Sequence, residues 1–130
     1  MIIDAHEIEM FANDTINAVS AARATYGLDC PKVVKLDPPL RMTGKFMESG
    51  RAAGEIEGLE RVRVVLEENQ GTFDALALAS VIQVDEAYHE EYFHCGGTMT
   101  NPWGGVEAML THALSLIYEI PTAHSPMLEN

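Results

Sequence analysis

The stretch TNPWGGVEAMLTHALSLIYEIPTAHSPM, residues 100–127, decides the fold class because a turn, a helix and a strand follow one another within it. A tight Asn-Pro-Trp-Gly-Gly turn opens the stretch. Apolar side chains then recur at helical spacing and predict a helix with one apolar stripe; they are Val106, Met109, Leu110, Ala113, Leu114 and Ile117. The segment IPTAHSPM predicts a short final strand ended by Pro126.

Outward from this stretch, the chain alternates between strand and helix patterns. MIID (residues 1–4) and KVVKL (32–36) predict strands, and a helix between them stops at Gly27. TGKFMESGRAAGEIEG (43–58) predicts a glycine-bearing loop, after which a helix runs from Leu59 toward Gly71. ALALASVI (75–82) is apolar on both faces, which is typical of a central strand in a parallel sheet. We therefore predict one α/β domain, residues 1–130, with a layered, mainly parallel sheet of about four strands flanked by helices.

Charge and composition exclude several classes of partner. The formal net charge of −12 argues against binding to nucleic acid or to anionic membranes. No apolar run approaches the roughly 20 residues of a membrane span, and the acidic first ten residues are unlike a signal peptide, so a cytoplasmic location is expected. Residues 64–130 contain no Lys or Arg. This acidic half either forms a solvated surface, which we favour, or attracts a cation, a metal or a basic partner.

Three side chains in the last helix and strand are the candidate catalytic groups: His112, His124 and Glu107. His124 is expected at the end of a strand, which is where parallel sheets place functional groups. Glu107 and His112 lie on opposite flanks of the helix stripe, so Glu107 is expected to orient a histidine across the helix–strand contact. Packed histidines and a carboxylate that favours the helix N-terminus are the plainer interpretation of the same residues.

Two other segments are candidate ligand-binding sites. The loop around SGRAAG offers backbone amides and positive charge to an anion, through Ser49, Gly50, Arg51 and Gly54. The turn contributes Asn101, Trp103 and Gly105. DEAYHEEYFHC (85–95) carries Glu-x-x-His twice, which occurs in metal sites, but a solvated acidic helix with Tyr88 and Tyr92 inward is the better interpretation.

The carboxyl ends of parallel strands meet at one edge of a sheet, where ligands bind. We expect five features to gather at this edge: Asp4, His6, the loop after Leu36, Asp85 and the Asn-Pro-Trp-Gly-Gly turn. Cys30 and Cys95 are too few for a disulfide framework and are expected to be free thiols.

Four segments, AARATYGLD, SGRAAGEI, NPWGGVEAMLTHALS and IPTAHSPM, together resemble the carboxyl-terminal part of a domain-of-unknown-function family common in cyanobacteria and archaea. The matching positions are Arg23, Asp29, Ser49, Gly50, Gly54, Pro102, Gly105, Glu107, His112, Pro121, His124 and Pro126. The resemblance lacks counterparts of Cys95, His89 and His94, and family members carry glycine in place of His6. It implies longer members with an additional amino-terminal half, and it implies no particular activity.

These patterns predict an α/β domain or subunit that forms one side of a small-molecule site, with an anionic ligand and enzymatic chemistry through histidine acid–base or metal-binding groups. His112 and His124 should then lie within about 8 Å of each other. The alternative is a non-catalytic interaction domain whose acidic half docks a partner protein. The sequence names no substrate, cofactor or metal.

Apolar residues outside the core stripes predict an interaction surface. They are Met42, Phe46, Met47 and Trp103. We expect a homo-oligomer or a complex with another polypeptide.

Overall fold

The structure of the chain, a computed structural model, describes residues 1–129. Six strands and four helices are formed within these residues. In chain order they are β1 (Ile2–Asp4), α1 (Glu9–Tyr26), β2 (Val34–Leu36), β3 (Arg41–Phe46), β4 (Ala52–Glu57), α2 (Leu59–Glu68), β5 (Leu76–Val84), α3 (Glu86–His94), α4 (Gly104–Tyr118) and β6 (Thr122–Met127). The predicted α/β class with a mainly parallel sheet is confirmed.

Strand β5 is the centre of the sheet. It pairs in parallel with β6 from Leu76 to Val81 and with β1 at Leu78 and Ala79. From Ile82 to Val84 it pairs instead with β3, also in parallel. The partners of β5 therefore change between its two halves, and we call the place where β1 ends and β3 begins the fork. This change leaves Asp4, the last residue of β1, next to a break in the sheet.

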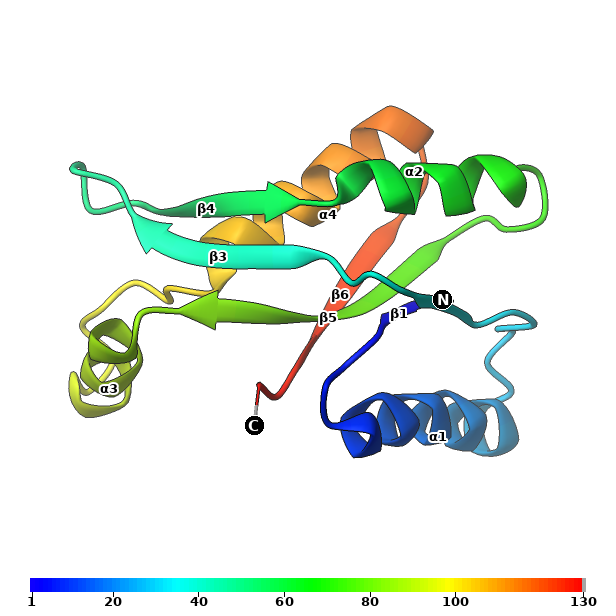
Figure 1. Cartoon of the computed structure of the whole chain (residues 1–130), viewed down its shortest axis with the longest axis horizontal. Helices are drawn as coiled ribbons and strands as arrows, with labels where there is room; N and C mark the ends of the chain where they lie inside the picture. The colour runs from blue at the N-terminus through cyan, green and yellow to red at the C-terminus, as the bar shows by residue number, and fades with distance from the viewer. Residues whose placement is uncertain (130) are drawn as a thin grey trace.

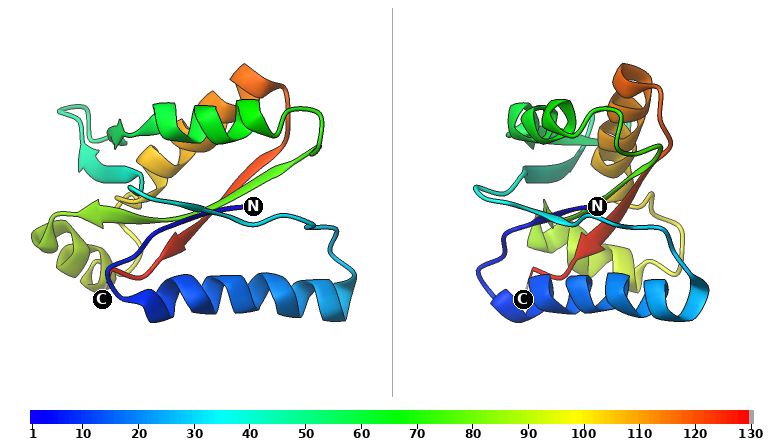
Figure 2. Two further views of the ribbon diagram at one scale, coloured as in Figure 1. Left: turned by 45° about the vertical axis from the view of Figure 1, so that its right-hand side comes forward. Right: turned by 90° about the vertical axis from the view of Figure 1, so that its right-hand side faces the viewer.

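Helices cover both faces of the sheet, α1 on one and α2 with α4 on the other (Figures 1 and 2). The larger core lies under α2 and α4, and it includes Leu78, Val62, Leu110 and Leu114. A smaller core around Ile3, Ala12 and Ala79 lies under α1. Alternate residues of β5 point into the two cores, as the period of a strand requires. The double burial of β5 explains why its sequence is apolar on both faces.

The predicted glycine loop at 43–58 is wrong, because this segment forms the antiparallel hairpin β3–β4. The hairpin also explains why the sheet has six strands and not about four. Gly54 lies within β4 because α4 packs directly on it. A Cβ at this position would lie 2.5 Å from the Cβ of Val106 and 2.3 Å from the carbonyl oxygen of Thr43. The glycine is a requirement of helix–sheet packing and not a sign of a loop.

The apolar stripe of α4 is narrower than predicted. Val106, Leu110 and Leu114 are fully buried, whereas Met109 is exposed and Ile117 is 64% exposed. The helix contacts the sheet along one line of side chains only, so residues at the margins of the stripe remain in solvent. No helix formed within residues 1–129 combines the length and the apolar character that a membrane span needs.

The predicted interaction surface does not include Met42, which is 0% exposed and part of the larger core. The alternation of β3 turns this side chain inward, beneath α4. Phe46 and Trp103 are half-buried, and Met47 in the β3–β4 turn is exposed.

Candidate functional site

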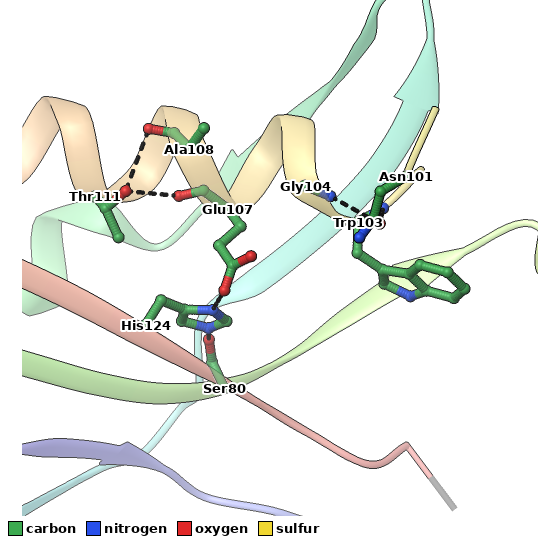
Figure 3. Close-up of polar contacts among 8 residues, drawn as sticks. All are labelled: Ser80, Asn101, Trp103, Gly104, Glu107, Ala108, Thr111 and His124. Atoms are coloured by element: carbon green, nitrogen blue, oxygen red, sulfur yellow. Dashed lines mark hydrogen bonds and ion pairs between the residues drawn. The ribbon is translucent and has the colours of Figure 1, made fainter. Parts of the chain in front are cut away.

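His124 is the centre of a chain of three polar side chains from three elements (Figure 3). Its Nε2 lies 2.7 Å from Oγ of Ser80 on β5, and its Nδ1 lies 2.9 Å from Oε1 of Glu107 on α4. With Glu107 as the acceptor, Nδ1 carries the proton, and Nε2 accepts the hydroxyl proton of Ser80. The expected contact between Glu107 and a histidine across the helix–strand packing is therefore formed.

The order serine, histidine, carboxylate is the one that hydrolases use to activate a serine. Here, however, Ser80 is 0% exposed and the His124 side chain is also 0% exposed. Neither Ser80 nor His124 lines the cleft described below, so no opening leads a substrate carbonyl to Oγ there. These two hydrogen bonds give every buried polar atom of the three side chains a partner, and they connect α4 to β5 and β6. The geometry of Ser80, His124 and Glu107 fits a structural hydrogen-bond network within the core.

His112 does not join this chain. It is exposed on α4, and five residues at about 100° per residue turn it about 140° away from Glu107. No hydrogen bond between the described residues links it to His124. The side chain of α4 that contacts His124 is Glu107 and not His112, and the expected separation of about 8 Å between the two histidines stays a prediction.

The residues of the Asn-Pro-Trp-Gly-Gly turn organise the start of α4. Asn101 Oδ1 accepts hydrogen bonds from the backbone N–H of Trp103 at 2.9 Å and of Gly104 at 3.2 Å. Gly105 lies against the hairpin, where a Cβ would come within 2.3 Å of the carbonyl carbon of Ala52. Each of these residues has a structural task, and their predicted role in ligand binding stays a prediction.

Ser49, Gly50 and Arg51 form the exposed turn between β3 and β4. Gly50 has a φ of 79°, and the Met47 N–H donates to the carbonyl oxygen of Arg51 at 2.9 Å. The open loop of backbone amides that was expected here is replaced by a tight hairpin turn. Anion binding at this turn stays a prediction.

A cleft of about 580 Å³ opens at the fork of the sheet. Its wall combines the end of β1, the segment 38–40, the start of β3 and the first turn of α2. Asp4, His6 and the loop after Leu36 thus meet at one site, as expected from the strand ends. Asp85 is not part of this cleft. Its Oδ1 instead accepts a hydrogen bond from the backbone N–H of Ala87 and caps α3. The Asn-Pro-Trp-Gly-Gly turn also lies outside its lining.

Asp4 is the unusual residue of this cleft. It is 2% exposed, and within residues 1–129 its two carboxyl oxygens are the buried side-chain polar atoms without a hydrogen-bond partner. Burial disfavours the charged carboxylate and raises the pKa of Asp4 to about 7. The backbone of Leu40 and the charge of Arg61 only partly oppose this rise in the pKa.

The polar neighbours of Asp4 are engaged elsewhere. Arg61 donates from Nε to the carbonyl oxygen of Pro38 at 3.0 Å and from Nη2 to that of Pro39 at 2.7 Å. Nδ1 of His6 accepts a hydrogen bond from the backbone N–H of Ile8, so Nε2 carries the proton and donates to the carbonyl oxygen of Leu128, which lies 2.8 Å from Nε2. The cleft thus holds fixed donors around a carboxyl whose two buried oxygens lack a well-formed hydrogen bond, although the backbone of Leu40 lies near enough to lower the pKa of Asp4.

Sequence reasoning did not select Ser80, and it listed Asp4 only among the groups of the sheet edge. A single hydroxyl in the apolar run of β5 and a carboxyl at the end of the buried strand IID were the available signals. In the part of the chain that the structure describes, no group of three or more His, Cys, Asp or Glu side chains is placed to hold a metal ion.

The fold and the cleft define a mainly parallel α/β domain with a buried, unpartnered carboxyl at the fork of its sheet. The chain belongs to the family described as "Protein of unknown function (DUF3326)", whose family model matches residues 1–130. This match confirms the resemblance to a domain of unknown function. The assignment to the carboxyl-terminal part of longer members, and the occurrence in archaea, stay predictions.

A protein from Synechococcus sp. (strain ATCC 27144 / PCC 6301 / SAUG 1402/1), named as an uncharacterized lipoprotein, is 27% identical over 110 residues. The alignment covers 84% of this chain and 31% of the relative, so the chain spans about a third of the relative's length. No solved structure matches the chain. The cytoplasmic location expected for this chain stays a prediction.

Proposed function

We propose that this domain binds a small molecule in the fork cleft and that Asp4 exchanges a proton with the bound ligand. One observation carries the proposal: Asp4 lines the cleft, yet both of its buried oxygens lack a hydrogen-bond partner. A buried polar group without a partner costs about 1–3 kcal/mol, and buried side-chain polar atoms in folded proteins are mostly paired. A ligand that brings donors to Asp4 would remove this cost.

The position and size of the cleft support the same proposal. Ligands of open parallel sheets bind beyond the carboxyl ends of strands, at places where the strand order changes. The cleft volume of about 580 Å³ lies within the range of small-molecule sites. A carboxyl with a pKa of about 7 also takes up and releases a proton at neutral pH, which suits general acid–base catalysis. The acid–base group would thus be a carboxyl and not the predicted histidine pair.

The test is a fragment screen by NMR on the full chain, with the backbone amides of Ala5, Leu40 and Arg61 as reporters of the cleft. Polar fragments should shift these three amides in the wild type and bind more weakly to Asp4→Asn. Asp14→Asn, which alters an exposed carboxyl on α1, is the matched control and should bind as the wild type does. Fragments that leave all three amides unmoved would exclude the cleft as the binding site.

The second candidate is the interaction domain, and it rests on α3. All nine residues of this helix are exposed or half-buried, and Phe93 is 67% exposed. Phe93 and Tyr92 contact the ring of Trp103 in a continuous aromatic surface. The same helix carries exposed Glu86, Glu90 and Glu91. Aromatic faces among carboxylates favour a Lys- or Arg-rich segment of a partner, through ion pairs and cation–π contacts.

Trp103 is the single tryptophan of the chain, so its fluorescence reports on this surface directly. An Arg-rich peptide should change the emission, and added salt should weaken the effect, since exposed ion pairs are screened. Phe93→Ala should weaken binding, whereas Glu9→Gln on α1 should not. An acidic peptide of equal length that binds as well as the basic one would refute charge recognition.

A further inference from the structure

The charges around the fork cleft favour a cationic ligand. Five carboxyl side chains line it, against two arginines; the carboxyl residues are Asp4, Glu7, Glu57, Glu60 and Glu129, and the arginines are Arg41 and Arg61. Both arginines already have acceptors. Arg61 binds the carbonyl oxygens of Pro38 and Pro39, and Arg41 pairs with Glu57 at 3.8 Å. An anionic ligand would meet an excess of like charge near Asp4.

The hydrogen-bonding groups of the cleft also indicate the chemical class of the ligand. A carboxylate only accepts hydrogen bonds, and its two oxygens offer about four lone-pair sites. An ammonium brings three donors, and a guanidinium brings two parallel N–H groups that match a carboxylate. Both groups add a positive charge, which offsets the energetic cost of burying the ionised carboxylate of Asp4.

We infer that the fork cleft binds a compact organic cation, an amine or a guanidinium, whose N–H groups donate to the two oxygens of Asp4. This inference rests on the proposed small-molecule site and specifies the chemical class of its ligand. It differs from the anionic ligand predicted for the Ser49–Gly54 segment, which lies outside the cleft.

Cation binding should be coupled to loss of a proton. Because the pKa of Asp4 is about 7, half of the free protein carries a proton on this carboxyl at pH 7, and a cation prefers the ionised form. The affinity should therefore rise with pH and level off above pH 7. From pH 6 to pH 8 the ionised fraction rises about tenfold, and the Kd should fall about tenfold.

Other titratable and charged groups face the cleft from each element around it. His6 and Glu7 follow β1, Arg41 belongs to β3, Glu57 ends β4, Glu60 and Arg61 belong to α2, and Glu129 follows β6. Gln83 of β5 is uncharged and donates to Glu129 at 3.0 Å. All of these residues are retained in Asp4→Asn, so the difference between this variant and the wild type isolates the contribution of Asp4.

The experiment is an NMR shift titration of the full chain with ethylammonium and with guanidinium at pH 6, 7 and 8, with acetate and inorganic phosphate as anionic probes. We expect cleft amides to shift with the cations only and the Kd to fall about tenfold from pH 6 to pH 8. Asp4→Asn should lose both the binding and its pH dependence, whereas Asp14→Asn should keep them. The dispersion of the NMR spectrum verifies that each variant is folded.

The outcomes separate this inference from the proposed function. If neutral or anionic fragments bind at the cleft through Asp4 and neither cation does, the small-molecule site stands and the cation inference is refuted. If no class of probe moves the cleft amides, both are refuted. Cation binding that persists unchanged in Asp4→Asn would also overturn the inference.

Discussion

Replacement of Asp4 by Asn tests the central physical claim, that folding buries a carboxyl without a partner. Asn has nearly the same shape but carries no titratable proton. In the wild type, the pKa of Asp4 rises on folding from 3.8 to about 7. The native state therefore holds a proton that the unfolded chain releases, and the free energy of unfolding must decrease as pH rises through this interval.

The magnitude follows from the same shift in the pKa. Each unit corresponds to about 1.4 kcal/mol, so the full change is about 4 kcal/mol and is complete above pH 7. Of this change in the free energy of unfolding, about 2.5 kcal/mol falls between pH 5 and pH 8. Stability from this group is fully present below pH 3.8 and is lost as pH rises toward 7. Relative to the wild type, Asp4→Asn should thus gain stability as pH rises.

The assay is urea unfolding of both proteins at pH 5, 6, 7 and 8, with the difference in free energy of unfolding plotted against pH. Subtraction removes the titration of all groups that the two proteins share. Asp14→Asn changes an exposed carboxyl and should give a nearly flat difference. A flat difference for Asp4→Asn as well would show that Asp4 is hydrated or paired in solution, and the proposed site would lose its support.

Three further predictions concern the parts of the fold that position the cleft. Ser80→Ala leaves Nε2 of the buried His124 without its partner and should destabilise the protein by about 1–3 kcal/mol, measured by urea unfolding; a cost near zero would mean that the polar chain is not formed. Gly54→Ala forces a Cβ to within 2.5 Å of Val106 and should cost roughly 1–3 kcal/mol in the same measurement, whereas Ser49→Ala in the exposed turn serves as a control within about 0.5 kcal/mol. His112→Ala should change stability by less than about 0.5 kcal/mol because this side chain is exposed, and a larger loss would indicate a partner for His112 in solution.

Local patterns in the sequence determined the type and order of most elements. The spacing of apolar residues in α4 and the run of apolar residues in β5 reflect how a helix and a doubly covered strand bury their side chains. Gly27 ends α1 as predicted, with a φ of 65° that suits glycine. These properties depend on residues close together in the chain, so the sequence by itself was sufficient for them.

The hairpin β3–β4 depended on tertiary structure. Gly44 and Gly54 resemble loop residues when only the local sequence is considered, because glycine weakens a strand. Glycine is needed at these two positions because Pro102, just before α4, packs against Gly44 and Val106 of α4 packs against Gly54, between 50 and 60 residues further along the chain. No local pattern records that distance.

For the candidate site, too, some features were predictable from the sequence and others depended on tertiary structure. Sequence reasoning could place Glu107 in the first turn of a helix and Asp4 at a strand end, because these positions follow from element boundaries. It selected His124 as a residue at a strand end, but this residue lies inside β6 (Thr122–Met127). Tertiary structure alone brought His124 to Ser80, through the pairing of β6 with β5, and turned His112 into solvent. It alone also directed Arg61 to the carbonyl oxygens of Pro38 and Pro39 and left Asp4 without a partner, because hydrogen-bond satisfaction depends on which groups meet in space.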